Sequence, residues 1–312
     1  MTDVKRRTAL DRKMDKIRAL EESGRNATKL TSRTLRKILS NKLAVLGAVL
    51  FVVICVLCFA APLFTQYSAT QISLRERMAE PSAAHIFGCD QMGRDIWARM
   101  LYGGRISIVV GLGSAVGAAL IGVTLGMFVG YKGGWADKII LKISDVFLSF
   151  PQMVLIIIIV ALVGQSLENM IIIFILTGWP SMYRMARSQV LSLKEEEFVQ
   201  ALRAFGISDV KIAFKHMLPN AVGPIVVNIT LSTAMFILQE ASLSVLGYGV
   251  PQEIAKWGNI INVITNAGVI RYDWLDKWWM WLPCAVMLIL FVLAINFIGD
   301  GLRDASDPTQ IG

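Results

Sequence analysis

Few residues in this chain of 312 have the types and spacing that chemistry requires. Cys55 and Cys58 have the C-x-x-C spacing of redox or metal pairs, but they lie inside a long apolar run that lacks the polar surroundings of a reactive thiolate. The two histidines, His85 and His216, are far apart and form no metal-ligand pattern. An enzyme needs nucleophilic, acid/base or metal-binding residues that converge on one site. We therefore expect no catalytic residue and no metal site.

The elements that must position any functional residue are membrane helices. Hydrophobic residues make up 55% of the chain and charged residues only 17%, whereas a soluble domain has about 25% charged residues. The apolar residues are concentrated in six runs, each near the ~20 residues that cross ~30 Å of hydrocarbon. We predict an all-α polytopic protein whose six transmembrane helices lie near 43–64, 106–130, 139–163, 169–187, 221–246 and 279–299.

Basic residues predict the orientation. Lys and Arg are frequent in residues 1–42 and again in 184–215, so the positive-inside rule places both segments and both termini in the cytoplasm. Acidic residues interleave with the bases of the first segment, which favours contact with anionic lipid over nucleic-acid binding. The expected organisation is a cytoplasmic arm (1–42), a first membrane anchor (43–64), an extracytoplasmic loop (65–105), a core of five transmembrane helices (106–300) and a cytoplasmic tail (301–312).

The most organised polar stretch is EFVQALRAFGISDVKIAFKHMLPN, residues 197–220, between two long apolar runs. Helical spacing predicts an apolar stripe there: Phe198, Ala201, Leu202 and Phe205. Gly206 permits the positive φ of a sharp turn, and a second short helix is expected to begin near Ser208 and to end before Pro219. We interpret residues 197–220 as a helix–turn–helix on the inner membrane face whose apolar stripe binds another protein.

These residues resemble the EAA loop of ABC-type importer permeases. In that loop a Glu-Ala-Ala start is followed by Gly six residues later and by Leu-Pro near the end. Here Gln200 and Leu202 depart from the usual Glu and Ala, and His216 stands where the residue is usually aliphatic. The resemblance implies that loop 191–220 contacts an ATPase subunit through Glu197, Gln200, Ala201, Leu202, Phe205, Gly206, His216, Leu218 and Pro219.

The resemblance extends over most of residues 85–308. Segments similar to signatures of the C-type subunit in the dipeptide/oligopeptide branch occur in the family's order at 85–107, 130–151, 240–251, 257–261 and 297–308. The resemblance implies the type I importer permease fold and a location in a bacterial or archaeal cytoplasmic membrane. It also implies transport of dipeptides or oligopeptides.

The partners that this resemblance implies are a second, homologous permease subunit in a heterodimer, two cytoplasmic ATPase subunits and an extracytoplasmic peptide-binding protein. ATP and Mg would bind to the ATPase subunits, and this chain would bind no cofactor itself. The sequence agrees, because it contains no G-x-x-x-x-G-K-[ST] phosphate loop.

Two carboxylates inside the apolar runs are candidates for the translocation path. An unpaired charge in a membrane is costly, so Asp145 and Glu240 are each expected to face protein or water. A functional interpretation makes them contacts for the amine of a peptide, and a structural one pairs them with neighbouring polar or basic groups. We favour the structural interpretation for Asp145 and leave the two open for Glu240.

Two alternatives to peptide import stay open. The same machine could import nickel chelates or another small solute, because the binding protein largely selects the cargo. A self-sufficient ion-coupled carrier is a different class, which predicts inverted repeats with paired broken helices and charges at the membrane midplane. No repeat is apparent in the sequence, which argues against this class.

Overall fold

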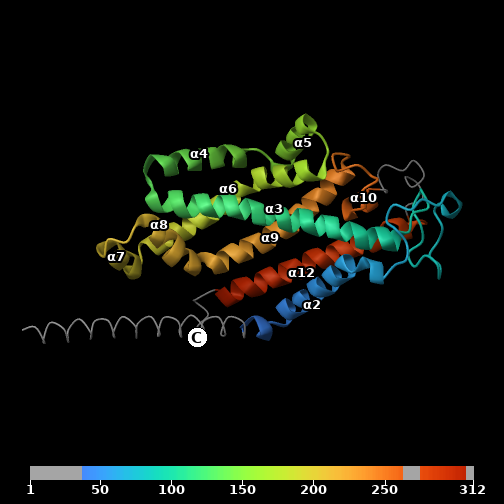
Figure 1. The fold of residues 1–312 in the computed structure, drawn as a ribbon, viewed down its shortest axis with the longest axis horizontal. Coiled ribbons are helices and arrows are strands. Elements are labelled where there is room, and N and C mark those ends of the chain that lie inside the picture. The colour runs from blue at the N-terminus through green and yellow to red at the C-terminus, as the bar shows by residue number, and fades with distance from the viewer. Residues whose placement is uncertain (1–36, 263–274, 307–312) are drawn as a thin grey trace, which may run out of the picture.

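The computed structural model describes residues 37–262 and 275–306, and long helices dominate them (Figure 1). The helices are α2 (Lys42–Phe59), α3 (Ile96–Lys132), α4 (Gly134–Ser149), α5 (Gln152–Val163), α6 (Leu167–Lys194), α7 (Glu197–Ala204), α8 (Asp209–Lys211), the π-helical turn η3 (Ile212–Met217), α9 (Leu218–Val245), α10 (Trp257–Ile261) and α12 (Leu282–Ser306). The part of the chain that the structure describes also contains the short 3-10 turns η1 (Ala61–Leu63), η2 (Leu74–Glu76) and η4 (Trp278–Met280).

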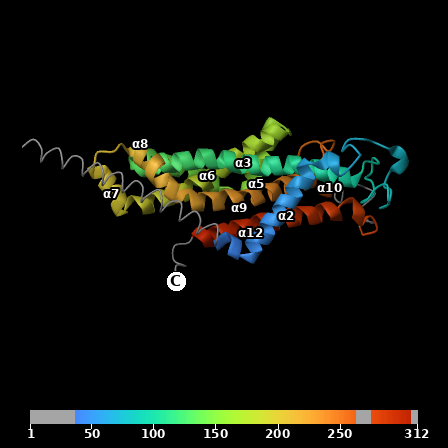
Figure 2. The ribbon, with the colours of Figure 1, turned by 60° about the horizontal axis from the view of Figure 1, so that its bottom comes forward.

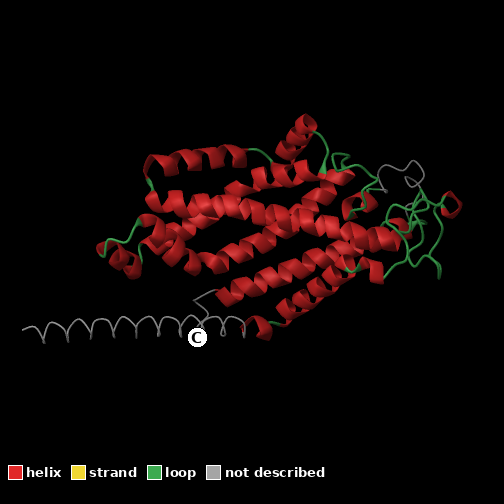
Figure 3. Cartoon of the chain, in the orientation of Figure 1, coloured by secondary structure: helices red, strands yellow, loops and turns green. Residues whose placement is uncertain are grey.

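The long helices form an elongated bundle in which α3 contacts both α6 and α9, and α12 contacts both α9 and α2. Figure 2 shows the same arrangement from a second direction. Helices α7 and α8 lie at one end of the bundle, which we call the α7 end. Helix α10 and most of the loops lie at the opposite end, the α10 end (Figure 3).

Within residues 37–262 and 275–306, four helical stretches are long and apolar enough to cross a membrane, or five when the bent pair α4–α5 counts as one span. The four are Lys42–Phe59, Ile96–Lys132, Asp209–Val245 and Leu282–Ala305. They coincide with four of the six predicted spans, and the bent pair coincides with a fifth. The remaining predicted span lies in α6, whose 28 residues are long enough to cross but include charged residues in both end turns.

The third predicted span is not a single straight helix. Helices α4 and α5 meet at an angle of 90° around Phe150 and Pro151. Proline has no backbone N–H and disfavours helical geometry in the residue before it, and Phe150 accordingly has an extended ψ of 143°. The bend therefore follows from one local residue type inside an otherwise apolar run.

Helix α3 begins at Ile96, ten residues before the predicted start of the second span. The carboxylate of Asp95 accepts a hydrogen bond from the backbone N–H of Ala98 at 2.6 Å and so caps the helix. Residues 96–105 are consequently the first three turns of the long helix, although the sequence placed them in the loop 65–105.

Small residues on α3 allow α6 to pack closely against it. A Cβ atom added to Gly122 would lie 2.6 Å from the carbonyl oxygen of Trp179, and one added to Gly126 would lie 2.7 Å from the Cβ of Ala186. Such small-residue faces let helix backbones approach in lipid. These two glycines thus join helices of this chain to each other.

Candidate functional site

The turn at Gly206 has the geometry that its sequence predicts. Gly206 has a φ of +70°, its N–H donates to the carbonyl of Arg203 at 2.9 Å, and the N–H of Ile207 donates to the carbonyl of Leu202 at 3.2 Å. These two bonds form the Schellman motif, which satisfies the last carbonyls of α7. An added Cβ would meet nothing within 4 Å, so the positive φ, and not lack of space, favours glycine here.

Helix α7 presents two apolar faces instead of the single predicted stripe. Val199 is fully buried, and Leu202 packs beside it against Met127 and other residues of the bundle. On the other face, the Phe205 side chain is 83% exposed and Phe198 is 38% exposed. The inward face attaches the helix, which leaves the two phenylalanines free to contact another molecule.

A small apolar hollow lies between the C-terminal end of α3 and the α8–η3 segment. Its volume is about 170 Å³, which is below the roughly 300–1,000 Å³ of a typical small-molecule pocket. It is lined by Phe128, Tyr131, Lys132, Asp209, Val210 and Ala213. Phe128 and Val210 are both exposed and apolar, so the hollow adds a second exposed apolar surface at the α7 end.

The sequence predicted that the second helix of the segment ends before Pro219, but the structure shows that the helix continues through Leu218 and Pro219. The helical path continues from Asp209 to Val245 through α8, η3 and α9. Pro219 occupies the first turn of α9, where a missing N–H is tolerated. The preceding turn is π-helical, an irregularity that is frequent at functional sites.

The other predicted contact residues lie along the same segment. Glu197, Gln200 and Ala201 are exposed on α7, and the Gln200 side chain donates to the carbonyl of Glu195 at 3.2 Å. His216 and Leu218 are half-buried, and Pro219 is exposed. The structure therefore keeps most of the predicted contact residues at least partly accessible at the α7 end.

Tyr131 attaches this segment to α3 in a way that sequence reasoning missed. Its hydroxyl accepts a hydrogen bond from Arg203 Nε at 2.8 Å, and its carbonyl accepts one from Lys194 Nζ at 3.0 Å. The Arg203 guanidinium also lies over the Tyr131 ring, 4.9 Å from its centroid. A tyrosine directly after an apolar run near several bases was the only sequence signal for this contact.

Two ion pairs attach α4 to α6. Asp137 accepts from Arg187 Nε at 2.6 Å and Nη2 at 2.5 Å, and also from the Tyr183 hydroxyl at 3.1 Å. Asp145 pairs with Arg184, which is the structural role favoured from the sequence. The Asp145 pair is about half-exposed and contributes roughly 0–1 kcal/mol. The bidentate Asp137 pair is less exposed and is the stronger attachment.

Glu240 lies at the α10 end and is completely buried. Its Oε1 forms an ion pair with Lys256 Nζ at 2.5 Å, and its Oε2 accepts a hydrogen bond from Ser107 Oγ at 3.2 Å. Lys256 is also completely buried. The sequence left open whether Glu240 contacts the amine of a peptide or pairs with a neighbouring group. These contacts match pairing with a neighbouring basic group.

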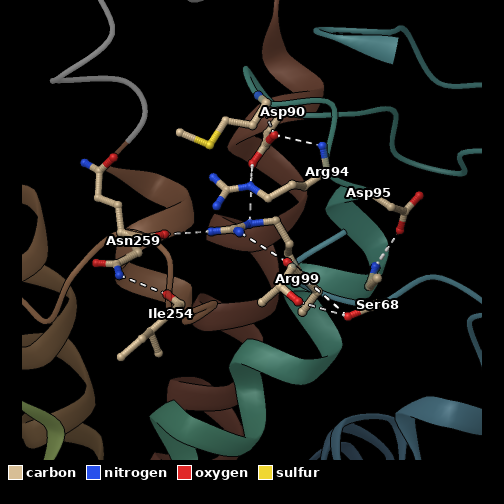
Figure 4. Close-up of polar contacts among 12 residues, drawn as sticks. Ser68, Asp90, Arg94, Asp95, Arg99, Ile254 and Asn259 are labelled. Atoms are coloured by element: carbon tan, nitrogen blue, oxygen red, sulfur yellow. Dashed lines mark hydrogen bonds and ion pairs between the residues drawn. The ribbon is translucent and has the colours of Figure 1, made fainter. Parts of the chain in front are cut away.

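A second charged cluster joins the loops of the α10 end (Figure 4). Asp90 Oδ2 accepts from Arg94 Nε at 2.7 Å and lies 3.5 Å from Arg99 Nε. Arg99 also donates to the carbonyls of Ala69 and Gln252, each at 3.3 Å. One buried guanidinium thus connects α3 to two loops that are distant in the sequence.

His85 lies between two carboxylates next to this cluster. Its Nδ1 lies 2.8 Å from Asp95 Oδ2, its Nε2 lies 3.4 Å from Glu76 Oε1, and its ring stacks on Tyr67. Burial lowers the pKa of His85, but the hydrogen bonds to Asp95 and Glu76 raise it by more, so the pKa lies above its usual value. The protonated ring is therefore the form that the fold favours.

We expect the loop around His85 to open as the pH rises. A raised folded-state pKa means that the stabilisation is complete below the unfolded value of about 6.5 and is lost as pH rises through the folded value. Hydrogen exchange of residues 76–95, corrected for intrinsic rates, should therefore increase between about pH 6 and pH 8. His85→Gln should remove this pH dependence, and His216→Gln should retain it. Equal pH dependence in wild type and His85→Gln would contradict the assignment.

Comparison with known proteins identifies the family. Residues 122–311 match the family described as binding-protein-dependent transport system inner membrane component, and residues 29–81 match the N-terminal TM domain of oligopeptide transport permease C. The dipeptide transport system permease protein DppC of Alkalihalophilus pseudofirmus is 39% identical over 273 residues, 88% of each chain. The oligopeptide transport system permease protein OppC of Bacillus subtilis is 36% identical over 288 residues, 92% of each chain.

The family match includes the whole of residues 197–220 and both partners of the Glu240–Lys256 pair. The relatives match nearly end to end, so the similarity is not confined to one motif. The chain therefore belongs to the binding-protein-dependent inner-membrane components, the permease subunits of ABC-type transporters, in their dipeptide/oligopeptide branch.

Proposed function

We propose that this chain is a permease subunit of an ATP-driven, binding-protein-dependent importer of dipeptides or oligopeptides. The observation that carries the proposal is the exposed face of α7, where Phe198 and Phe205 project from a helix that the Gly206 turn and Val199 fix to the bundle. Large exposed apolar side chains on a polar segment are typical of a protein contact site. The names of the similar permeases support peptides as the cargo.

In this proposal the α7 end faces the cytoplasm and binds one of two ATPase subunits, which carry the ATP and Mg. Movement of the ATPase subunits on nucleotide binding shifts the segment 197–220 and, through the continuous helical path Asp209–Val245, the bundle. A second, homologous permease subunit completes the translocation path. An extracytoplasmic peptide-binding protein delivers the cargo at the α10 end, and the complex lies in a bacterial or archaeal cytoplasmic membrane.

Phe205→Glu is expected to release the ATPase subunits when the complex is extracted in mild detergent. The substitution places a charge on the most exposed apolar side chain of α7, where the proposed interface would desolvate it. The measurement is the amount of ATPase that co-purifies with the affinity-tagged chain. Leu74→Glu is the matched control, because Leu74 is 76% exposed but lies at the α10 end. Unchanged ATPase recovery with Phe205→Glu would contradict a contact through this face.

A further inference from the structure

The short helix α10 and the residue before it are inserted among three long helices. The Trp257 side chain is fully buried, its Nε1 donates to the carbonyl of Met100 in α3 at 3.0 Å, and its ring packs against Phe291 of α12. Its carbonyl accepts a contact from Cys284 Sγ of α12 at 3.6 Å. A segment between two membrane helices thus belongs to the core of the bundle.

Charged side chains connect this segment to α9. Lys256 and Glu240 are both completely buried, with 2.5 Å between Nζ and Oε1. The ammonium makes this ion pair without an aligned hydrogen bond to a described residue. The carboxylate has further partners, because Ser107 of α3 donates to Oε2 and Ser244 of α9 lies 3.2 Å from Oε1. The Ser107 oxygen also accepts the Trp257 N–H at 3.3 Å.

Two glycines allow the backbones to approach closely enough for this arrangement. A Cβ added to Gly103 of α3 would lie 2.8 Å from the Cα of Lys256, and one added to Gly258 of α10 would lie 2.7 Å from the Cα of Ala241. Both distances are to backbone atoms, which cannot move aside as the end of a side chain can. The backbone of residues 256–258 is therefore in close contact with both α3 and α9.

The opposite end of the same helical path carries the segment 197–220. Asp209–Val245 is one continuous helical stretch of 37 residues, with η3 near one end and Glu240 near the other. At about 1.5 Å per residue, such a path spans the membrane. A displacement at the α7 end can therefore reach Glu240 through helical backbone without crossing a loop.

We propose that Glu240 and Lys256 are positioning residues that fasten α10 to α9, so that α10 moves with the helix that leads from the ATPase-binding segment. This inference rests on the proposed function and extends it to the α10 end. Two apolar side chains would fill the same space without the penalty of burying two charges. The ion pair instead fixes which surface of α10 faces α9. Asn259 of α10 donates to the carbonyls of Pro251 and Ile254, so the loop before α10 moves together with α10.

The test is the coupling ratio, which is the number of peptides imported per ATP hydrolysed by the complete complex in proteoliposomes. Glu240→Gln with Lys256→Gln removes both charges at similar side-chain volume, so neither charge is left buried alone. We expect this double variant to assemble and to hydrolyse ATP, with a coupling ratio that falls about tenfold, within the usual range for coupling between distant sites. A purely structural pair would lower the yield of complex and leave the ratio per assembled complex unchanged, which would overturn the inference.

Ser107→Ala gives a second, milder variant that decides the question if the double variant does not assemble. It removes the hydroxyl that joins Glu240 to the Trp257 N–H and keeps the helix intact. A lowered coupling ratio supports the inference, and an unchanged ratio overturns it. Ser114→Ala is the matched control, because Ser114 is also fully buried in α3 but its hydroxyl has no hydrogen-bond partner among the described residues. Absence of ATP-driven uptake by the wild-type complex would instead refute the proposed function.

Discussion

Proline in place of Gly206 is expected to reduce peptide uptake strongly while the chain stays in the membrane. Proline fixes φ near −65°, whereas Gly206 has a φ of +70°. It also removes the N–H that donates to the carbonyl of Arg203. The turn must then change, and the exposed face of α7 loses its orientation. Uptake by the complete complex should fall by about tenfold or more, since each ~1.4 kcal/mol of lost docking free energy is a factor of ten.

Two further glycine variants separate this effect from general damage. Gly206→Ala keeps the N–H and strains the backbone by roughly 1–2 kcal/mol, so a partial loss of uptake is expected. Gly164→Pro is the matched control, because Gly164 also has a positive φ, of +88°, also donates its N–H to a helix carbonyl, and has nothing within 4 Å of an added Cβ. It lies between α5 and α6, away from the α7 end. Normal uptake by Gly206→Pro would refute the role of this segment.

Lys256→Met is expected to be the most destabilising single substitution at the α10 end. It leaves the Glu240 carboxylate buried without its cation, and breaking a buried ion pair in this way costs about 3–5 kcal/mol. The thermal midpoint of unfolding should fall by several degrees. A thiol-reactive dye can follow unfolding, because Cys58, Cys89 and Cys284 are free and buried in the folded chain.

The variant that combines Lys256→Met with Glu240→Gln provides the control for this prediction. Removal of both charges restores a neutral site, so most of the lost thermal stability should return. A double variant that is as unstable as Lys256→Met would show that Lys256 contributes through the packing of its chain and not through the ion pair. Lys277→Met, at an intermediate-exposure lysine of the same end, should have little effect on the midpoint.

The features predicted correctly from the sequence are those set by local interactions. The turn at Gly206 is one, because a glycine between two amphipathic stretches readily adopts the positive φ that such a turn requires. Pro219 shows the limit of the same reasoning. A proline in the interior of a helix disrupts it, whereas a proline in the first turn, as here, is compatible with the helix. Which of these two applies to Pro219 depends on where α9 begins, and α9 begins directly after the π-helical turn η3.

Contacts between distant residues were harder to predict. Lys256 lies in a polar stretch between two apolar runs, where a lysine is ordinarily exposed, and only the fold brings it to Glu240. The same is true of Tyr131 and Arg203, which are 72 residues apart. The bend at Pro151 had a local signal, but hydrophobic length alone favours one uninterrupted span. Length and composition therefore indicate that a segment can cross a membrane, but they do not specify whether it crosses as one straight helix.

The central claim is that this chain transports peptide only as part of an ATP-driven complex. The most direct measurement is peptide uptake by proteoliposomes containing the complex purified through this chain, with ATP and Mg on the side of the ATPase subunits. We expect a second permease and ATPase subunits in the purified complex, and uptake that requires both ATP and the peptide-binding protein. Peptide uptake by this chain alone, driven by an ion gradient and independent of ATP, would contradict the account and identify a self-sufficient carrier.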